Sequence, residues 1–287
     1  MKILNYGSIN KDFVYTVEDF VKSGETIKTI EFKDFLGGKG LNQSIAVAKS
    51  GNKIFHAGCI NKNDIQIKNY LKKWGVDTKN IFYDDEPTGH AIIQVNKKGE
   101  NSILVHGGAN RKINSKHIEK TISEFNSGDF LLIQNEINKI PEIIERAYFQ
   151  KMKIIFNPAP FTTEVLDYPL EKVDTIIYNE TEGKGLSGYE KIHEIKSNLL
   201  KKYPNLKQIL TLGNQGAIYF DKKTEVPVNA IKAKTVDTTG AGDTFIGYYV
   251  SSLSKKMKIK DCLLRASKAA GITTEKLGGA ISIPSID

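Results

Sequence analysis

The chain has 287 residues, of which 40% are hydrophobic and 26% charged, as in an ordinary globular protein of one large domain, residues 1–287. Its start lacks the apolar core of a signal peptide and no later run reaches membrane-spanning length, so we expect a cytoplasmic protein without a membrane partner. The net charge of +8 would suit nucleic acid, but the basic residues are almost all scattered lysines, which disfavours that partner. Cys59 and Cys262 are single and far apart, so they indicate neither a disulfide framework nor a zinc site.

Strands dominate the first part of the chain. Residues 3–9 predict a buried strand that ends in polar groups, the place where α/β sheets hold their ligands. Residues 13–17 and 26–32 predict two strands with one solvated face, joined through Gly24 and Glu25. A buried strand over 54–60 and a helix over about 64–74 follow.

Residues 35–44 form a glycine-rich stretch that leads into an apolar helix over 45–50 and a stop at Gly51. Three glycines, a lysine and an amide at a helix start indicate a backbone packed against a polar ligand, with a purely structural turn as the alternative. The spacing fits neither the phosphate-binding P-loop nor the dinucleotide fingerprint, so any nucleotide site here is of another kind.

A hairpin is predicted from residues 89–96 and 101–106, closed by the turn at 97–100. With the earlier pair this makes four strands that do not alternate with helices. We expect them to form a separate small sheet, whose apolar face covers a site or meets a second copy of the chain.

From residue 130 onward, strands alternate with helices, as in a parallel sheet covered on both faces. The predicted strands end in polar groups or, after 208–212, in a glycine-containing loop at 213–216 that is flexible enough to lie along phosphates. They span 130–134, 154–156, 175–178 and 208–212, followed by a strand at 217–220 and a helix at 261–275.

Residues 236–245 are a polar, glycine-rich turn that runs directly into an apolar helical segment. The first N–H groups of a helix lack partners and carry partial positive charge, which suits the oxygens of a transferring phosphoryl group. Gly240, Ala241 and Gly242 are expected to supply these groups, and Asp243 to accept a proton from an attacking hydroxyl. The alternative is an ordinary helix start, where an acidic residue is favoured anyway.

The glycine clusters at 37–44 and 237–243 resemble the two signatures of the ribokinase-like (PfkB) carbohydrate kinase family, in the family's order and at its separation. The resemblance covers essentially the whole chain. It implies a three-layer α/β fold with a central, mostly parallel sheet flanked by helices, and a small β-sheet lid from about 13–32 and 88–106.

The same resemblance implies transfer of the γ-phosphate of ATP to a primary hydroxyl of a small sugar, with ribose as the first candidate. Another sugar, a sugar acid or a nucleoside is the alternative acceptor. A sugar- or nucleotide-binding regulator without catalysis is the alternative from a different class, which an intact Gly-Ala-Gly with Asp243 disfavours. A homodimer formed through the lid is also expected.

The family pattern assigns individual residues to the two substrates. Loop capping is the alternative role for Asn10 and Asp12, and helix capping for Asn179 and Glu182. The sugar is expected to be held by Asn10, Asp12, Gly38, Lys39, Asn42 and Glu136, with Asp243 as base, and ATP by Asn179, Thr211, Gly213, Gly216 and Ser267.

Two cations are implied as well. Glu182 would position magnesium through water, since magnesium keeps several of its waters. Potassium would be held by Asp237, Thr239, Thr273, Lys276, Gly278 and Ser282. Two departures from the family bear on these sites: Ser267 stands where a histidine is often found near the adenine, and 277–282 differs from the usual tail.

Overall fold

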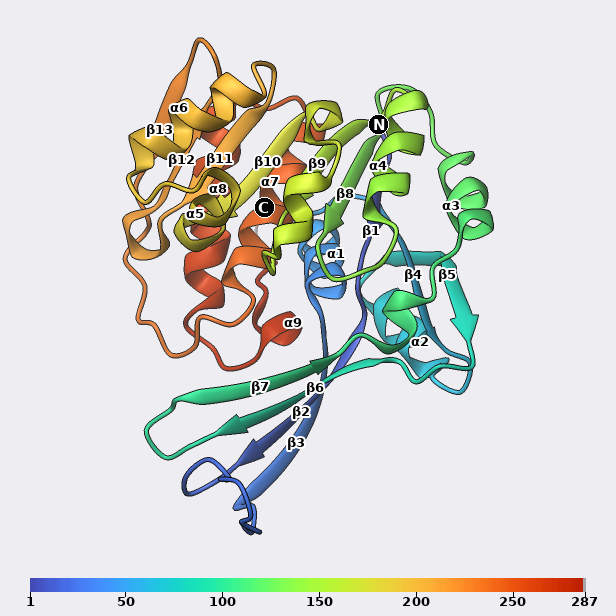
Figure 1. Ribbon diagram of the computed structural model, residues 1–287, viewed down its shortest axis with the longest axis vertical. Coiled ribbons are helices and arrows are strands. Elements are labelled where there is room, and N and C mark those ends of the chain that lie inside the picture. The colour runs from blue at the N-terminus through green and yellow to red at the C-terminus, as the bar shows by residue number, and fades with distance from the viewer. Residues whose placement is uncertain (286–287) are drawn as a thin grey trace.

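The structure is a computed structural model that describes residues 1–285. Over this range it contains a nine-stranded sheet with helices on both faces and a four-stranded sheet that projects from one end of the molecule (Figure 1). The large sheet comprises β1 (Ile3–Tyr6), β4 (Ile54–Asn61), β5 (Val76–Asp84), β8 (Phe130–Gln134), β9 (Lys153–Asn157), β10 (Thr175–Asn179), β11 (Lys207–Thr211), β12 (Ala217–Phe220) and β13 (Glu225–Val228).

The large sheet runs in the order β13, β12, β11, β10, β9, β8, β1, β4, β5. All neighbouring strands from β11 to β5 are parallel, whereas β12 pairs antiparallel with both of its neighbours. The central strands are buried along nearly their whole length because both faces are covered. Parallel strands end at one edge of a sheet, which gathers their carboxyl ends in one place.

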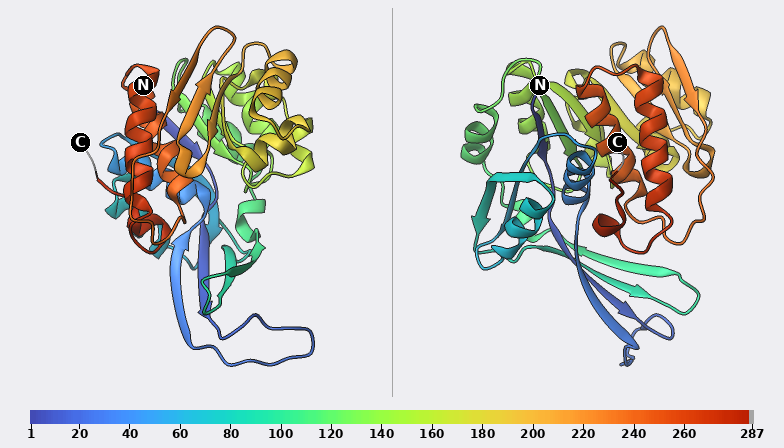
Figure 2. Two further views of the ribbon diagram at one scale, coloured as in Figure 1. Left: turned by 90° about the vertical axis from the view of Figure 1, so that its left-hand side faces the viewer. Right: turned by 180° about the vertical axis from the view of Figure 1, so that it is seen from behind.

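Two helical layers cover this sheet, each over its own hydrophobic core. Figure 2 shows α7 and α8 on one side of the sheet and the segments coloured yellow and green on the other. One layer holds α1 (Lys39–Lys49), α2 (Gln66–Lys73), α7 (Ala241–Ser254) and α8 (Ile259–Thr273), and the other holds α3 (Ser115–Ile122), α4 (Ile140–Phe149), α5 (Glu180–Ser187) and α6 (Ile192–Lys202). A short helix, α9 (Gly279–Ser282), follows α8. The predicted three-layer fold is confirmed.

The lid sheet consists of β3 (Glu31–Gly37), β2 (Asn10–Thr16), β6 (Gly89–Val95) and β7 (Asn101–His106), in that order. A separate sheet from these parts of the chain is therefore confirmed, but the strand predicted at 26–32 is wrong. Residues 26–30 lie outside any strand, and β3 begins at Glu31 because it pairs with β2 from Thr16↔Glu31 to Asn10↔Gly37. The glycine-rich stretch at 35–44, which was expected to lead into a helix, thus begins as the last residues of β3.

Other element bounds differ from the sequence prediction. The helix predicted at 45–50 begins at Lys39, and the strand predicted at 3–9 ends at Tyr6. Gly40 lies in the first turn of α1, where a Cβ would overlap the backbone of Gly7 and Ser8. The first turn of α1 therefore lies directly on the loop that carries the chain from β1 into the lid sheet. The strand β5 was not predicted.

The helices α1 and α7 pack backbone against backbone. A Cβ on Gly247 of α7 would overlap the Cβ of Ala46 in α1 and lie 2.9 Å from the carbonyl oxygen of Gln43. This close approach brings the start of α7 next to the start of α1. No helix within residues 1–285 has the length and apolar content needed to cross a bilayer.

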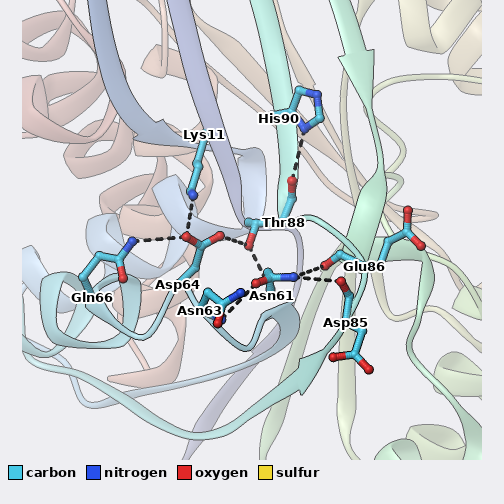
Figure 3. A network of polar contacts seen from close by, with 9 residues as sticks. All are labelled: Lys11, Asn61, Asn63, Asp64, Gln66, Asp85, Glu86, Thr88 and His90. Carbon is cyan, nitrogen blue, oxygen red and sulfur yellow. Dashed lines mark hydrogen bonds and ion pairs between the residues drawn. The ribbon is translucent and has the colours of Figure 1, made fainter.

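A polar network ties the lid sheet to the body (Figure 3). Lys11 of β2 lies 2.5 Å from Oδ1 of Asp64, in the turn before α2. The hydroxyl of Thr88, next to β6, donates to Oδ2 of Asp64 at 2.6 Å and accepts from the backbone N–H of Asn61 in β4 at 2.9 Å. Both central strands of the lid sheet, β2 and β6, are therefore anchored close to their starts.

Candidate active site

A cavity of about 210 Å³ opens where the carboxyl ends of β9, β10 and β11 meet the starts of α1, α5 and α7. A larger hollow of about 770 Å³ lies over α4 and contains none of the predicted site residues. The smaller cavity is therefore the candidate site. The predicted residues that line it are Lys39, Asn179, Glu182, Thr211, Gly240, Gly242 and Asp243.

The start of α7 presents an open backbone to this cavity. Gly240 caps the helix at φ 77°, a left-handed conformation that favours glycine. The N–H of Ala241 donates to the carbonyl of Thr238 at 3.2 Å, within the turn that precedes the helix. At Gly242 a Cβ would meet no heavy atom within 4 Å, which leaves room for an anion against the positive end of the helix.

Asp243 lies directly behind this open backbone and is 8% exposed. Its two carboxylate oxygens accept hydrogen bonds from two side-chain amides of α1, one from Nδ2 of Asn42 at 3.0 Å and one from Nε2 of Gln43 at 2.9 Å. The carboxylate is thus held in a fixed orientation by neutral donors, which leaves it able to accept a proton.

Lys39 is the positive charge among the buried carboxylates of the site. Burial alone lowers the pKa of Lys39. The negative charges of Asp243, Glu136 and Glu182 outweigh this effect, so the pKa of Lys39 lies above its ordinary value. Burial raises the pKa of Glu136, although Lys39 and the hydroxyl of Ser8 oppose this shift. The ammonium group therefore remains charged where phosphate oxygens would enter.

The predicted sugar-binding residues meet between the lid sheet and α1. The side chain of Asn110 is fixed by the backbone of Ile9 and donates to Oδ1 of Asn10 at 2.8 Å. Gly38 has φ 89°, and a Cβ there would lie 3.1 Å from the N atom of Asn10. Asp12 is close by, since a Cβ on the preceding glycine, Gly37, would overlap its carboxylate.

Glu136 joins this group through the backbone N–H of Lys39, from which it accepts at 2.9 Å. Burial and the nearby charge of Glu136 raise the pKa of Asp12 to about 6. Two half-buried carboxyl groups thus border the space in front of α1. Groups of this kind bind sugar hydroxyls, which donate and accept hydrogen bonds.

On the nucleotide side, Asn179 and Glu182 form a capping box at the start of α5. The Asn179 side chain accepts from the N–H of Glu182 at 2.9 Å, and Glu182 accepts in return from the N–H of Asn179 at 2.9 Å. Both residues also line the cavity. The capping role and the ligand role, which the sequence left as alternatives, are thus compatible.

Three of the four remaining nucleotide predictions, Gly213, Gly216 and Ser267, lie outside the cavity lining. Gly213 and Gly216 flank the turn between β11 and β12, and Gly216 has φ 107° with the carbonyl of Val228 where a Cβ would be. Ser267 is buried in α8, and its hydroxyl has no hydrogen-bond partner among the described residues. Gly216 therefore has a structural reason to be glycine, and only Thr211 of this group faces the cavity.

The predicted potassium ligands are partly brought together. The carboxylate of Asp237 accepts from the N–H of Thr239 at 2.9 Å and of Gly278 at 3.0 Å. The Ser282 hydroxyl donates to the carbonyl of Gly279 at 2.8 Å, and the carbonyl of Thr273 accepts from the N–H of Lys276 at 3.4 Å. The loop before α7 and the segment before α9 are thus held together at Asp237.

The sequence reasoning missed several residues of the site. Gln43 contacts Asp243, Asn157 lines the cavity and Asn110 holds Asn10. Asn157 ends a strand, as did the residues that were singled out, and this position was the available signal. Gln43 lies within the singled-out cluster at 37–44, but nothing in the sequence marked its side chain as a contact of Asp243.

In the part of the chain that the structure describes, no group of three or more His, Cys, Asp or Glu side chains is arranged to hold a metal. Glu182 is 9% exposed and borders the cavity, and burial raises its pKa, although the N–H of Asn179 and the charge of Lys39 oppose this shift. One carboxylate beside a polar cavity fits a hydrated magnesium ion, which takes oxygen ligands and retains waters.

A model of the family described as pfkB family carbohydrate kinase matches residues 1–286. The chain belongs to this family of kinases. The kinase is 35% identical over 299 residues to a ribokinase of Staphylococcus aureus, covering 100% of this chain and 97% of the relative. It is 32% identical to a deoxyribokinase of Salmonella typhi, with coverage of 100% and 97%.

Solved structures agree with this assignment. The structure of Arabidopsis thaliana ribokinase complexed with ribose and ATP superposes on the kinase with a TM-score of 0.87 at 26% identity, covering 99% of this chain and 95% of that one. The predicted family, fold and activity class, an ATP-dependent sugar kinase, are therefore confirmed.

Proposed function

We propose that this kinase transfers the γ-phosphoryl group of ATP to the 5-hydroxyl of D-ribose. The observation that carries the proposal is the placement of the buried Asp243 carboxylate directly behind the open backbone of Gly242, at one cavity with Lys39. The choice of ribose is supported by relatives named ribokinase and by the Arabidopsis complex with ribose and ATP.

In the proposed mechanism the sugar hydroxyl lies between Asp243 and the γ-phosphorus. Asp243 accepts the hydroxyl proton as the hydroxyl oxygen bonds to phosphorus, and the bond from phosphorus to the bridging oxygen breaks to release ADP. The charge on the moving phosphoryl group is stabilised by Lys39 and by the backbone at Gly240 and Gly242. Such transfers depend mainly on positioning and electrostatics, which the start of α7 would supply.

The cations belong to this proposal. Glu182 would hold a magnesium ion through water, and the ion would reduce the negative charge of the phosphates. A potassium ion beside the loop at Asp237 would stabilise the turn that leads into Gly240. We also propose a cytoplasmic location, which is consistent with the use of ATP and with the free, buried Cys59 and Cys262.

The lid sheet would exclude water, which competes with the sugar as phosphoryl acceptor. It also exposes large apolar side chains, among them Phe32 at 50%, Leu104 at 66% and Val105 at 67%. Exposed apolar patches of this kind mark interaction surfaces. We therefore include a homodimer that forms through the lid sheets of two copies.

A coupled ADP-release assay over a panel of acceptors tests the proposal. The panel contains ribose, 2-deoxyribose, fructose, a keto-deoxy sugar acid and a nucleoside, each with ATP and magnesium. The expected result is the highest kcat/KM with ribose. A preference for another acceptor refutes ribose as the substrate, and no turnover with any of them favours the non-catalytic regulator.

A further inference from the structure

Asp243 is supported by a chain of buried amides that begins with Gln43 of α1. Gln43 donates from Nε2 to Oδ1 of Asp243 at 2.9 Å, and its Oε1 accepts from Nε2 of Gln134 at 2.6 Å. Gln134 donates as well to Oδ1 of Asn5 at 2.9 Å. Gln43, Gln134 and Asn5 are each 0% exposed, so water does not replace these bonds.

The donor-to-acceptor direction of these linked hydrogen bonds is fixed by a backbone carbonyl. Nδ2 of Asn5 donates to the carbonyl of Gly40 at 2.7 Å, and a carbonyl only accepts. The oxygen of the Asn5 amide must therefore face Gln134, the nitrogen of Gln134 must face Gln43, and the nitrogen of Gln43 must face Asp243.

A second contact, with Asn157, fixes the same orientation of the Gln43 amide independently. Nδ2 of Asn157 donates to the carbonyl of Ile177 at 2.9 Å, so the oxygen of its amide faces Gln43 and accepts from Nε2 at 3.4 Å. A reversed Gln43 amide would place its oxygen against two acceptors, Asn157 and the Asp243 carboxylate. Both anchors thus specify a donor at the position that touches the base.

We propose that Gln43 is a positioning residue that orients the Asp243 carboxylate for proton transfer, an inference that rests on the proposed kinase function. The other donor to Asp243, Asn42, belongs to the predicted sugar-binding group. When Asn42 turns its amide toward a sugar hydroxyl, Gln43 still holds Oδ1, and Oδ2 remains free for the proton. Gln43 does not contact the reacting atoms itself.

The test compares Gln43→Leu and Gln43→Glu with Gln208→Glu as a matched control. Gln208 is also 0% exposed, and its Oε1 accepts from the Tyr178 hydroxyl at 2.7 Å on the other side of the sheet. For each protein we measure kcat from pH 5 to pH 9 at saturating ribose and ATP, the Kd of ribose and of an ATP analogue, and the thermal midpoint of unfolding.

Gln43→Leu is expected to lower kcat on the order of 10²-fold, because a misplaced base loses its alignment, with both Kd values within about threefold of the wild type. Gln43→Glu sets a second carboxyl against Asp243, so the acid limb of the kcat profile moves to higher pH. The acid limb of Gln208→Glu stays at the wild-type position. A role in stability alone would lower the thermal midpoint of Gln43→Leu and leave the kcat of the folded protein close to that of the wild type.

Two outcomes overturn the inference: a folded Gln43→Leu protein with kcat within about threefold of the wild type, or a Gln43→Glu acid limb that coincides with that of Gln208→Glu. If Gln43→Leu does not fold, Gln43→Glu decides. If the wild type phosphorylates no acceptor, the proposed function fails separately. A crystal structure of Gln43→Leu then tests the positioning role, which an unmoved Asp243 carboxylate would contradict.

Discussion

The ammonium group of Lys11 lies 2.5 Å from Oδ1 of Asp64, and this contact joins the lid sheet to the body of the kinase. Lys11 stands between Asn10 and Asp12 on β2, and side chains alternate between the two faces of a strand. The same strand therefore carries two residues that are predicted to hold the sugar on one face, and an anchor to the body on the other.

Lys11→Met should weaken this anchor and raise KM for the sugar by about three- to fivefold with little change in kcat, because a partly exposed ion pair is worth up to about 1 kcal/mol. Steady-state kinetics with the best acceptor measure both constants. Lys62→Met is the matched control, since it removes the exposed pair between Lys62 and Asp85 in the same region. Equal KM values in the two variants would show that the Lys11 contact does not govern the lid sheet.

Asp243→Asn should lower kcat by about 10²-fold or more, because the amide cannot accept the hydroxyl proton. The Kd values of sugar and of an ATP analogue should stay close to those of the wild type, since Asp243 contributes to a step that follows binding. Calorimetry and the coupled assay provide the two readouts. Near-normal turnover would reject Asp243 as the base.

Gly242→Ala should produce a kinase that is more stable and less active. A Cβ at Gly242 meets no protein atom within 4 Å, and alanine in a helix is favoured over glycine by about 0.5–1 kcal/mol. The same methyl group occupies the space proposed for the γ-phosphate. Thermal unfolding should therefore show a higher midpoint, while kcat falls.

The matched control is Gly240→Ala, because Gly240 has φ 77° and alanine is strained there. This variant should lose stability. A Gly242→Ala kinase with wild-type kcat would place the phosphate elsewhere.

Asp12→Asn should be stabilising at pH 8 but not at pH 4. The pKa of Asp12 is raised from 3.8 to about 6 by burial and by Glu136. The unfolded chain therefore releases this proton before the folded protein does, and the folded state loses stability as the pH rises from about 4 to about 6. Asparagine does not ionise, which removes this loss.

Thermal midpoints of the variant and the wild type at the two pH values measure this effect, with Asp34→Asn, on the exposed part of β3, as control. If the thermal midpoints of Asp12→Asn and the wild type differ by the same amount at pH 4 and pH 8, the raised pKa of Asp12 is contradicted. In the wild type, kcat/KM for the sugar should fall below about pH 6 as the Asp12 carboxylate is protonated, because kcat/KM reports groups of the free enzyme.

Leu104→Glu should convert the expected dimer into a monomer, because the side chain is 66% exposed on the lid sheet and a charge there cannot be buried without cost. Light scattering of the wild type should give twice the mass of one chain. Light scattering of the variant should give the mass of one chain. Leu264→Glu, on α8 and 45% exposed, is the control and should leave the mass unchanged. A monomeric wild type would refute the dimer.

Much of the fold was predictable because strands and helices alternate from residue 130 onward, and buried parallel strands are short apolar runs. The strands of the lid sheet were less predictable from the sequence. The alternation at 26–32 had the right period, but pairing with β2 set the strand at Glu31–Gly37, and pairing partners are not written in one strand. β5 was missed because polar residues such as Thr78 and Asn80 are buried within it.

The site also contains residues that the sequence predicted and residues that it did not. Residues beside glycines at helix starts, such as Lys39 and Asp243, were found because backbone chemistry restricts which residues fit there. Gln43 and Gln134 were not, because an amide in a helix and an amide in a strand acquire their role only when the fold places them 2.6 Å apart. Their contact depends on how α1 crosses β8, which local sequence does not encode.

The carboxylate of Asp243 takes its two amide donors from positions 201 and 200 residues earlier in the chain. A ribosome therefore makes all six predicted sugar-binding residues, the last of them Glu136, before it adds the proposed base. A chain that ends before α7 would lack that base. The proposed active site is complete only when α7 packs against α1.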